Sequence, residues 1–402
     1  MRNSHGEFTN ALMYKILKQS KQPVTDPTLG QVDAHFLSPD EAAARVESHI
    51  PDSDNVPILT NGALHFPSSN MDSESRKRDN CDNDSDSTRP ISQFFDWMED
   101  LDRTVSVQIP SRRVDRDSFE PRKLAEIKRR FLDRKETNNP WNILDVANPV
   151  PAVLPEFLRG LNCQLLLRIR DVILMGDSAE RPLAQREEWS TWRDVLEWGL
   201  LSEGGHNTAP HTDSHGLETW ITVQEGLFGF GWLSRPTREQ RDEWMQDPQE
   251  YTKGDGRWRY VVLKPAQTIF FPSGTIHFVF RLRSEQTLAL GGHVLRWSGI
   301  ERWLRVVIDQ VRHPRTTNEE ISESVPSYVA AVVKLLRGRL KRGGEAVSEL
   351  GGIEVISSCM ALVKEFNMEY QQFQQTSYHA VMSIRMSQPC GTHMKNEKCW
   401  YH

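Results

Sequence analysis

The stretch GGHNTAPHTDSHGLETWITVQEGLFGFGW, residues 204–232, decides how this chain folds and where its chemistry lies. It places His211 and Asp213 two residues apart among residues typical of strands. Side chains alternate between the two faces of a strand, so both can point the same way. The later run TIFFPSGTIHFVF supplies His277 from another expected strand. We therefore expect these three side chains to meet on one side of a β-sheet.

Two imidazoles and one carboxylate on one face of a metal ion leave coordination positions open. Such a set suits non-haem Fe(II), which must admit dioxygen and a co-substrate, better than a closed structural zinc site. We therefore predict iron ligation by His211, Asp213 and His277, with a metal-free barrel as the alternative. His206 and His215 flank the motif, and for both we expect structural roles in loops.

Strand signals dominate from Val195 to His293, where short runs rich in β-branched and aromatic residues are separated by Gly, Pro or Ser. The segment at 236–251, PTREQRDEWMQDPQEY, interrupts them as a helical insertion. This order favours an all-β barrel or sandwich with a metal at its mouth. A parallel Rossmann-type sheet would need helices between most of the strands and is excluded.

The regions around the barrel differ in composition. Residues 1–89 are rich in Ser, Asp, Asn and Pro, and we expect them to be disordered. Residues 90–137 carry apolar residues at helical spacing, which predicts two amphipathic helices. The barrel occupies 138–312, a helical bundle at 313–388 caps it, and a tail covers 389–402. The expected fold class is therefore α+β.

The bulk composition narrows the classes of function. The chain has 402 residues, 26% of them charged, and a net charge of −6, which gives no reason to expect sequence-specific nucleic-acid binding. Five scattered cysteines and the lack of a signal-like N-terminus predict an intracellular protein, and no apolar run predicts a membrane span. The basic triplet at 76–78 favours the nucleus over the cytoplasm, with solvated charge as the alternative. The oligomeric state stays open.

The C-terminal tail holds two Cys-x-x-His pairs. Cys390 precedes His393, and Cys399 precedes His402. This is the spacing of zinc knuckles, although the pairs lie closer together than the roughly dozen residues usual for a finger. A frayed terminus is the alternative.

These motifs resemble the JmjC family, cupin-type oxygenases that include histone lysine demethylases and protein hydroxylases. The resemblance covers about residues 140–312. It rests on Thr208-x-x-His211-x-Asp213, on Pro272-Ser273-Gly274 followed by His277, and on Leu288-Ala-Leu-Gly-Gly-His293. The stretch TLALGGHVLRWSGIERWLR looks most like the lysine-demethylase subgroup whose members carry CXXC or PHD modules, and no such module is visible here.

The resemblance implies a double-stranded β-helix that binds Fe(II) and 2-oxoglutarate. It implies that 2-oxoglutarate is decarboxylated to succinate while a protein side chain, such as one in a histone tail, is hydroxylated. When the hydroxylated carbon is an N-methyl group of lysine, the product releases formaldehyde and free amine. Thr208 matches the position whose hydroxyl helps to hold the far carboxylate of 2-oxoglutarate. His293 stands where the family usually has an asparagine near the co-substrate, and its ring can donate one hydrogen bond.

The chain departs from the family beyond Trp220. Phe228 falls on the position of the lysine that pairs with the far carboxylate, and Ile221 falls on a neighbouring tyrosine position. Leaving a buried carboxylate without its partner costs about 3–5 kcal/mol, enough to abolish binding unless another cation replaces the lysine. Arg281, four residues after His277 on the same strand face, is a candidate replacement. A salt bridge at the barrel edge is the alternative role for Arg281.

Two other functions therefore stay open. The first is a non-catalytic JmjC-like barrel that binds a partner through a Trp-rich surface. The second is an oxygenase for a small metabolite, with Trp220, Phe230 and Trp232 as an apolar pocket wall. The second depends on these aromatic residues not being packed core.

Overall fold

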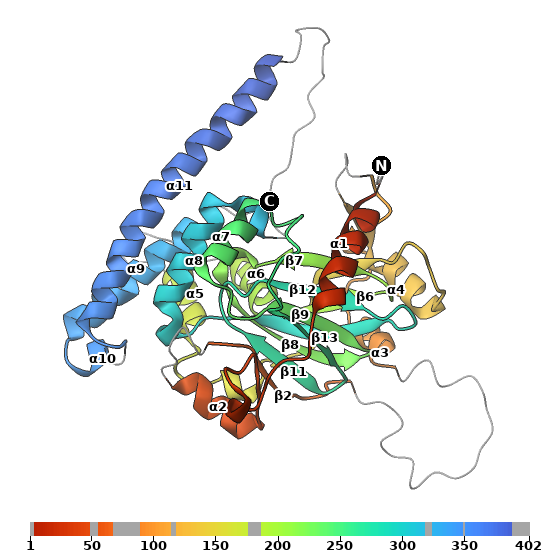
Figure 1. Ribbon diagram of the computed structural model, residues 1–402, viewed down its shortest axis with the longest axis horizontal. Helices are drawn as coiled ribbons and strands as arrows, with labels where there is room; N and C mark the ends of the chain where they lie inside the picture. The colour runs from red at the N-terminus through yellow and green to blue at the C-terminus, as the bar shows by residue number, and fades with distance from the viewer. Residues whose placement is uncertain are drawn as a thin grey trace.

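A computed structural model describes residues 4–48, 55–66, 89–113, 118–175, 186–317, 324–348 and 350–387. Two β-sheets occupy the centre of the molecule, and the last helices lie together at one end of them (Figure 1). The basic triplet at 76–78 and the Cys-x-x-His pairs of the tail lie outside the described residues.

The larger sheet has nine strands. In spatial order they are β1 (His35–Phe36), β2 (Ile58–Asn61), β11 (Gln267–Phe271), β8 (Glu218–Glu225), β13 (Thr287–Val294), β6 (Trp198–Ser202), β5 (Asn142–Ala147), β3 (Thr104–Gln108) and β4 (Phe119–Lys123). The smaller sheet contains β10 (Trp258–Leu263), β9 (Phe228–Leu233), β12 (His277–Arg281) and β7 (Asn207–His211). Neighbouring strands are antiparallel except for the β1–β2 pair.

Strand β8 shows why the two sheets pack on each other. Trp220 on one face of β8 packs with the N-terminal helices, whereas Ile221 and Val223 on the other face join a core shared with β9 and β10. Because side chains alternate along a strand, one apolar run can supply both layers. The larger sheet is therefore covered on both of its faces.

The sequence FGFGW on β9 fits the same arrangement. Its aromatic residues point into the core between the sheets, while Gly229 and Gly231 face outward. A Cβ on Gly231 would lie 2.0 Å from the ring of Phe278, and one on Gly229 would lie 2.4 Å from that of Phe280. Glycine is needed at both positions because rings from β12 lie flat against β9.

The two sheets do not close into one barrel. Among the described residues each sheet ends in unpaired edges, at β1 and β4 in the larger and at β10 and β7 in the smaller. The molecule is thus an α+β protein with a two-sheet antiparallel core, which is consistent with a jelly-roll architecture. Closure depends on hydrogen bonds between strands far apart in sequence, which local residue patterns do not encode.

The N-terminal region differs from the disorder that its composition predicts. Helices α1 (His5–Gln19) and α2 (Pro39–Glu47) are capped by Ser4 and Ser38. The buried face of α1, with Leu12 and Ile16, packs on the outer side of the smaller sheet, against β7, β10 and β12. The composition did not predict these helices because short helices gain their stability from tertiary packing rather than from local composition.

Residues 90–137 contain more than the two expected helices. Helices α3 (Pro90–Asp96) and α4 (Leu124–Asp133) are present, but the paired strands β3 and β4 lie between them and extend the larger sheet. The expected helical insertion is α7 (Arg238–Gln246). Two further helices, α5 (Leu165–Met175) and α6 (Arg186–Leu196), come before the first strand of the central region, β6.

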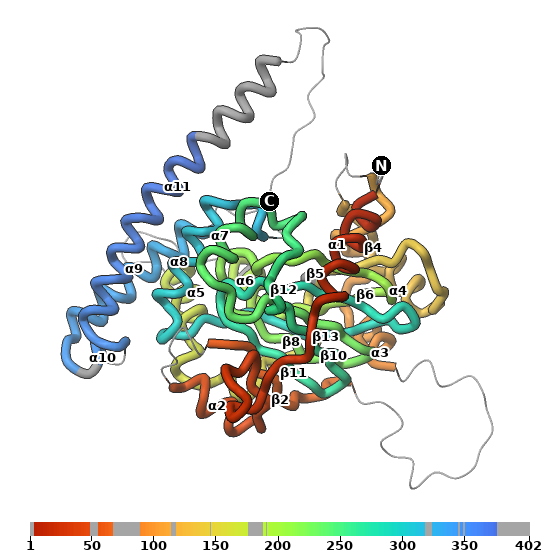
Figure 2. The backbone as a smooth tube through the Cα atoms, in the orientation of Figure 1, coloured from red at the N-terminus to blue at the C-terminus, as the bar shows by residue number. Residues whose placement is uncertain are grey.

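The C-terminal helices pack against one end of the sheets. They are α8 (Ile300–Arg312), α9 (Val325–Arg342), α10 (Glu345–Ser348) and α11 (Ile353–Ser387). The tube view shows α11 running along α8 and α9 (Figure 2). A fully buried ion pair, Arg296 with Glu218 at 2.8 Å, joins the end of β13 to β8 just before α8 begins. None of the helices in the described part of the chain is long and apolar enough to span a membrane.

Substitution Ile16→Ala tests whether α1 is part of the folded core. Ile16 is fully buried against the strands, so the change should lower the free energy of unfolding by about 2–5 kcal/mol. Chemical denaturation measures it. Tyr14→Ala on the same helix, 69% exposed, is the control and should shift stability by no more than about 0.5 kcal/mol. Equal, small effects from both changes would contradict the packing of α1.

Candidate metal centre

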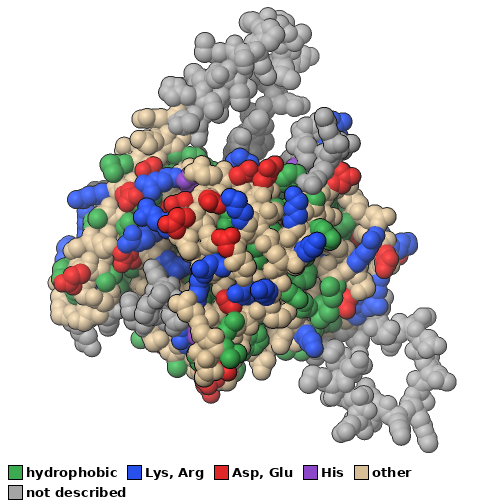
Figure 3. Space-filling model, viewed as in Figure 1, with side chains coloured by type: hydrophobic (Ala, Val, Ile, Leu, Met, Phe, Trp, Pro, Cys, Tyr) green, Lys and Arg blue, Asp and Glu red, His purple; other side chains and the backbone are tan. Residues whose placement is uncertain are grey.

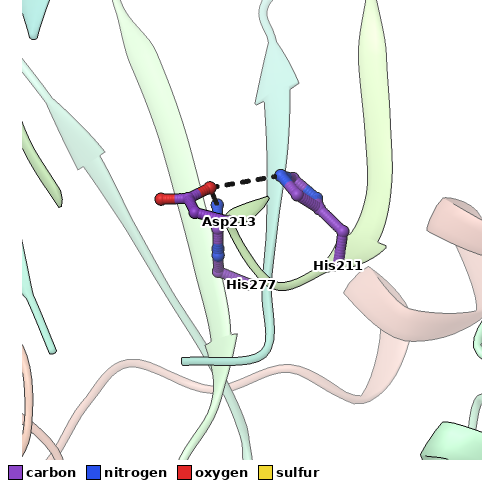
Figure 4. A group of neighbouring side chains, drawn as sticks. All are labelled: His211, Asp213 and His277. Carbon is purple, nitrogen blue, oxygen red and sulfur yellow. Dashed lines mark ion pairs between the residues drawn. The ribbon is translucent and has the colours of Figure 1, made fainter. Parts of the chain in front are cut away.

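Three side chains meet at one end of the smaller sheet. His277, the first residue of β12, pairs across the ladder with His211, the last residue of β7, and Asp213 follows two residues later. Nε2 of His277 lies 3.5 Å from Oδ1 of Asp213, and Nε2 of His211 lies 3.8 Å from the same oxygen (Figure 4). All the ligand atoms lie within 4.8 Å of one another. Donors bonded at about 2.1 Å to one ion have separations in this range.

In both histidines Nδ1 is hydrogen-bonded to a backbone carbonyl, and Nε2 faces the position where a metal ion would bind. Nδ1 of His211 lies 2.8 Å from the carbonyl oxygen of Ala209, and Nδ1 of His277 lies 3.0 Å from that of Thr275. A carbonyl only accepts, so each Nδ1 carries the proton and each Nε2 presents a lone pair. Orientation of metal-binding histidines by backbone carbonyls is usual in protein metal sites.

Asp213 is held from two sides. The hydroxyl of Thr219 donates to its Oδ2, which leaves Oδ1 facing the imidazoles. Nδ1 of His293 lies 3.1 Å from the same hydroxyl oxygen and can donate to it. Gln310 on α8 donates to the backbone carbonyl of Asp213 at 2.7 Å. The carboxylate is therefore fixed before any ion binds, which lowers the entropic cost of binding.

A tight turn sets where β12 begins. Thr275 donates its backbone N–H and its hydroxyl to the carbonyl of Pro272, and Gly274 between them has a φ of 68°. Glycine adopts this left-handed conformation without steric cost. The turn directs His277 into the core, and Ile276 and Phe278 on either side of it pack outward against the cluster that contains α1.

A cavity opens from the three residues into the core between the sheets. Its wall includes Thr208 and Arg281, together with Ile221 and Phe228 at the positions where the chain departs from the family. His293 lines the same cavity. The structure thus brings every predicted site residue to one cavity. The Nδ1 atom of His293 lies within hydrogen-bond distance of the Thr219 hydroxyl, which in turn holds Asp213.

Arg281 does not form the salt bridge that was the alternative role for it. It is 8% exposed, and no carboxylate among the described residues lies within ion-pair distance. Its guanidinium carbon lies 4.1 Å from the centre of the Phe228 ring, and its Nε has no hydrogen-bond partner there. Burial lowers the pKa of Arg281 to about 9, so it remains a cation at neutral pH.

The aromatic residues expected to wall a pocket are core instead. Trp220, Phe230 and Trp232 are at most 1% exposed and pack between or behind the sheets. Other residues supply the apolar part of the cavity wall: Leu144, Trp198, Leu200, Ile221, Phe228, Phe271 and Val279. The expectation that Trp220, Phe230 and Trp232 wall a small-molecule pocket is therefore wrong.

Burial governs the protonation of two histidines near the cavity. The pKa of His277 falls to about 4 because of desolvation, against a weaker opposing effect of its hydrogen bond to Thr275. The pKa of His206 falls to about 3, through desolvation and then the nearby charge of Arg281. Both rings are therefore neutral at pH 7, and His277 is ready to donate a lone pair.

Sequence reasoning missed the residues that hold Asp213. Thr219 lies on β8, the next strand along the chain. Because side chains alternate along a strand, Thr219 lies on the opposite face of β8 from Trp220, and this alternation was the available signal. Gln310 comes from α8, almost a hundred residues after Asp213, and no spacing links the two. His215, expected in a loop, has its Nε2 3.2 Å from the Ser324 hydroxyl, which ties that loop to the start of α9.

Comparison with known proteins gives one relevant similarity. No family model matches the chain. A curated protein of Caenorhabditis elegans, JmjC domain-containing histone demethylation protein 1, is 28% identical over 158 residues. Part of this chain is therefore similar to part of a JmjC protein. The match covers 37% of this chain and 14% of that relative, so it supports a distant family relationship and leaves the specific reaction open.

Metal binding tests the three ligands. His211→Ala, Asp213→Ala or His277→Ala should each weaken Co(II) binding by at least about 100-fold, and Thr219→Val, which frees the carboxylate, by about 10- to 100-fold. Visible absorption of the anaerobic Co(II) complex measures the affinity. His313→Ala, outside the site, should bind as the wild type does. Unchanged Co(II) affinity in the three ligand variants would rule out this centre.

Low pH should destabilise the metal-free protein. Because the folded pKa values of His206 and His277 lie below the unfolded value of 6.5, the unfolded chain takes up protons first as the pH falls. Stability is fully present above about pH 6.5 and should decline by up to about 1.4 kcal/mol per pH unit for each histidine down to its folded pKa. Denaturation between pH 7 and 5 measures the slope, and His206→Gln should reduce it.

Proposed function

We propose that this chain is an Fe(II)- and 2-oxoglutarate-dependent oxygenase of the JmjC type that acts on a protein side chain. One observation carries the proposal: two imidazole nitrogens and one carboxylate oxygen converge at the end of a core cavity. Three protein ligands leave positions for a co-substrate and dioxygen. The distant relationship to a JmjC histone demethylation protein supports the same conclusion.

We also assign the core to the double-stranded β-helix. Strands β11, β8, β13 and β6 lie side by side in the larger sheet and face β10, β9, β12 and β7 in the smaller. Consecutive strands β6 and β7 lie in different sheets, as do β12 and β13, which is the connectivity of a jelly roll. In such a fold the strand ends of the smaller sheet can present ligands toward an interior cavity.

The donor set fits Fe(II). Neutral imidazoles and a carboxylate are suitable ligands for this ion, whereas the described part of the chain brings no thiolate to the group. Bound iron would supply the activation of dioxygen. The overall reaction would convert R–H, dioxygen and 2-oxoglutarate into R–OH, succinate and carbon dioxide, and an N-hydroxymethyl product would release formaldehyde.

The residues of the chain would order this reaction. The backbone carbonyls of Ala209 and Thr275 fix the imidazole rings, and Thr219 fixes the carboxylate. The cavity, bounded by apolar side chains, would exclude water from the co-substrate. Thr208, on the same strand as His211, would donate its hydroxyl to an anionic group in that cavity.

We infer that the substrate is a protein side chain, with methyl-lysine of a histone tail as the first class to test. The support is the similarity to the C. elegans relative, which is a histone demethylation protein. A nuclear location would follow from that substrate. The proposed iron and 2-oxoglutarate chemistry does not depend on the histone substrate or on the nuclear location, because the metal site is independent of which substrate reaches the cavity.

A non-catalytic partner-binding barrel has less support. The tryptophans of the sheets are buried, and among the tryptophans that the structure describes Trp97 is the one with a largely exposed side chain, at 46%. The face shown in Figure 3 mixes acidic and basic side chains with scattered hydrophobic ones. The Trp-rich docking surface that motivated this alternative is therefore lacking in the described residues.

Turnover and spectroscopy test the proposal. Anaerobic addition of Fe(II) and 2-oxoglutarate to the wild type should give a weak visible charge-transfer band, and admission of dioxygen should give succinate. His211→Ala should abolish both, because the iron loses a ligand; we expect at least a roughly 100-fold loss of rate. His313→Ala should retain both. A folded wild type that binds Fe(II) but gives neither band nor succinate would count against the 2-oxoglutarate chemistry.

A further inference from the structure

Arg281 is a buried cation without a counter-charge inside the metal cavity. It is more than nine-tenths buried, it lines the cavity with the metal-binding group, and its Nε has no hydrogen-bond partner among the described residues. Its one printed hydrogen bond, from Nη1 to the carbonyl of Phe280, is long at 3.5 Å. A buried charge is costly unless it is paired, so this arrangement favours an anionic partner, which the described residues do not provide.

The charged neighbours of Arg281 do not supply that partner. Asp213 lines the same cavity, but its oxygens interact with the imidazoles and with Thr219 instead. His206 lies close enough for the guanidinium to contribute to its lowered pKa, but an imidazole is either neutral or cationic and cannot act as a counter-ion. The positive charge therefore remains available to a ligand in the cavity.

Phe228 holds the guanidinium in place. Arg281 and Phe228 pair directly across β12 and β9, and the guanidinium carbon lies 4.1 Å from the ring centre. Stacking on an aromatic face fixes the plane of the guanidinium and leaves its edge, with the N–H groups, free to donate. The phenylalanine at the position of the family lysine thus supports a cation that comes from the neighbouring strand.

The position of Arg281 relative to the metal suits a ligand with two ends. His277, Val279 and Arg281 alternate along β12 and line the cavity from one strand face. Thr208, which lies opposite Val279 on β7, adds a hydroxyl to the same wall. A ligand bound to the metal at one end would meet the guanidinium at the other, with apolar side chains along its middle.

We propose that Arg281, seated on Phe228, receives the far carboxylate of 2-oxoglutarate. This inference rests on the proposed function, because it assumes that the other end of the co-substrate lies at the metal. Arginine can grip a carboxylate through two parallel N–H···O bonds. The cavity should therefore select a 2-oxo acid that carries a second carboxylate over one of the same chain length that lacks it.

Binding of two 2-oxo acids to the Mn(II)-loaded full chain tests the inference without turnover. Calorimetry under anaerobic conditions would compare 2-oxoglutarate with 2-oxopentanoate, which lacks the far carboxylate. The wild type should prefer 2-oxoglutarate by about 100-fold. Arg281→Gln should lose this preference, mainly through weaker 2-oxoglutarate binding, while Arg281→Lys should keep part of it.

Two further variants make the test specific. Arg283→Gln, an exposed arginine two residues away that hydrogen-bonds Asn138, is the matched control and should keep the wild-type preference. Adding Phe228→Lys to Arg281→Gln returns a cation to the neighbouring strand and should restore at least about tenfold selectivity. Mn(II) affinity, measured first, should be the same in all variants.

The outcomes separate the inference from the proposed function. A wild type that binds Mn(II) but takes both acids equally well would overturn the role of Arg281, and this result does not depend on the folding of any variant. A preference that survives in folded Arg281→Gln would also overturn it, while leaving the oxygenase proposal intact. Failure of the wild type to bind Mn(II), Co(II) or Fe(II) would instead refute the metal centre on which both rest.

Discussion

The antiparallel pairing of β7 with β12 places His211 directly opposite His277, and the candidate site depends on that register. A shift of one residue would turn one of the two imidazoles to the other face of the sheet. The register is supported on the outer face, where Ile276 and Phe278 pack into the cluster that contains α1 and Trp258. Packing outside the sheet thus holds the ligand geometry inside it.

Two arginines, Arg296 and Arg281, are buried in the interior of the molecule. The pair Arg296–Glu218 is fully buried and satisfied by several hydrogen bonds, so it joins β8 to the segment between β13 and α8. Arg281 is also buried but has no such partner among the described residues. Arg296 thus stabilises the fold, whereas Arg281 is available to a ligand. Burial is common to both arginines, so only their partners distinguish these two roles.

The N-terminal region shows how composition can mislead. Its polar, unpatterned residues predict disorder, yet α1 covers the strand that carries His277, and β2 extends the larger sheet beside β11. Each segment is too short to be stable alone, and its few apolar residues gain their energy from surfaces formed by later parts of the chain. Similarly, β3, which lies between α3 and α4, is held by its pairing with β5, and β4 is held by its pairing with β3.

The sequence by itself indicated the candidate ligands, because the His-x-Asp spacing and the PSGTIH turn are local features. It also determined the strand-rich core, since alternation and turn residues act over a few positions. The tertiary structure alone decided that the sheets form an open sandwich, that Trp220 and Trp232 are core, and that Arg281 lies on Phe228 without a carboxylate. These features arise from contacts between strands and helices far apart in the chain, and no local pattern encodes which distant group will fill or neutralise a buried position.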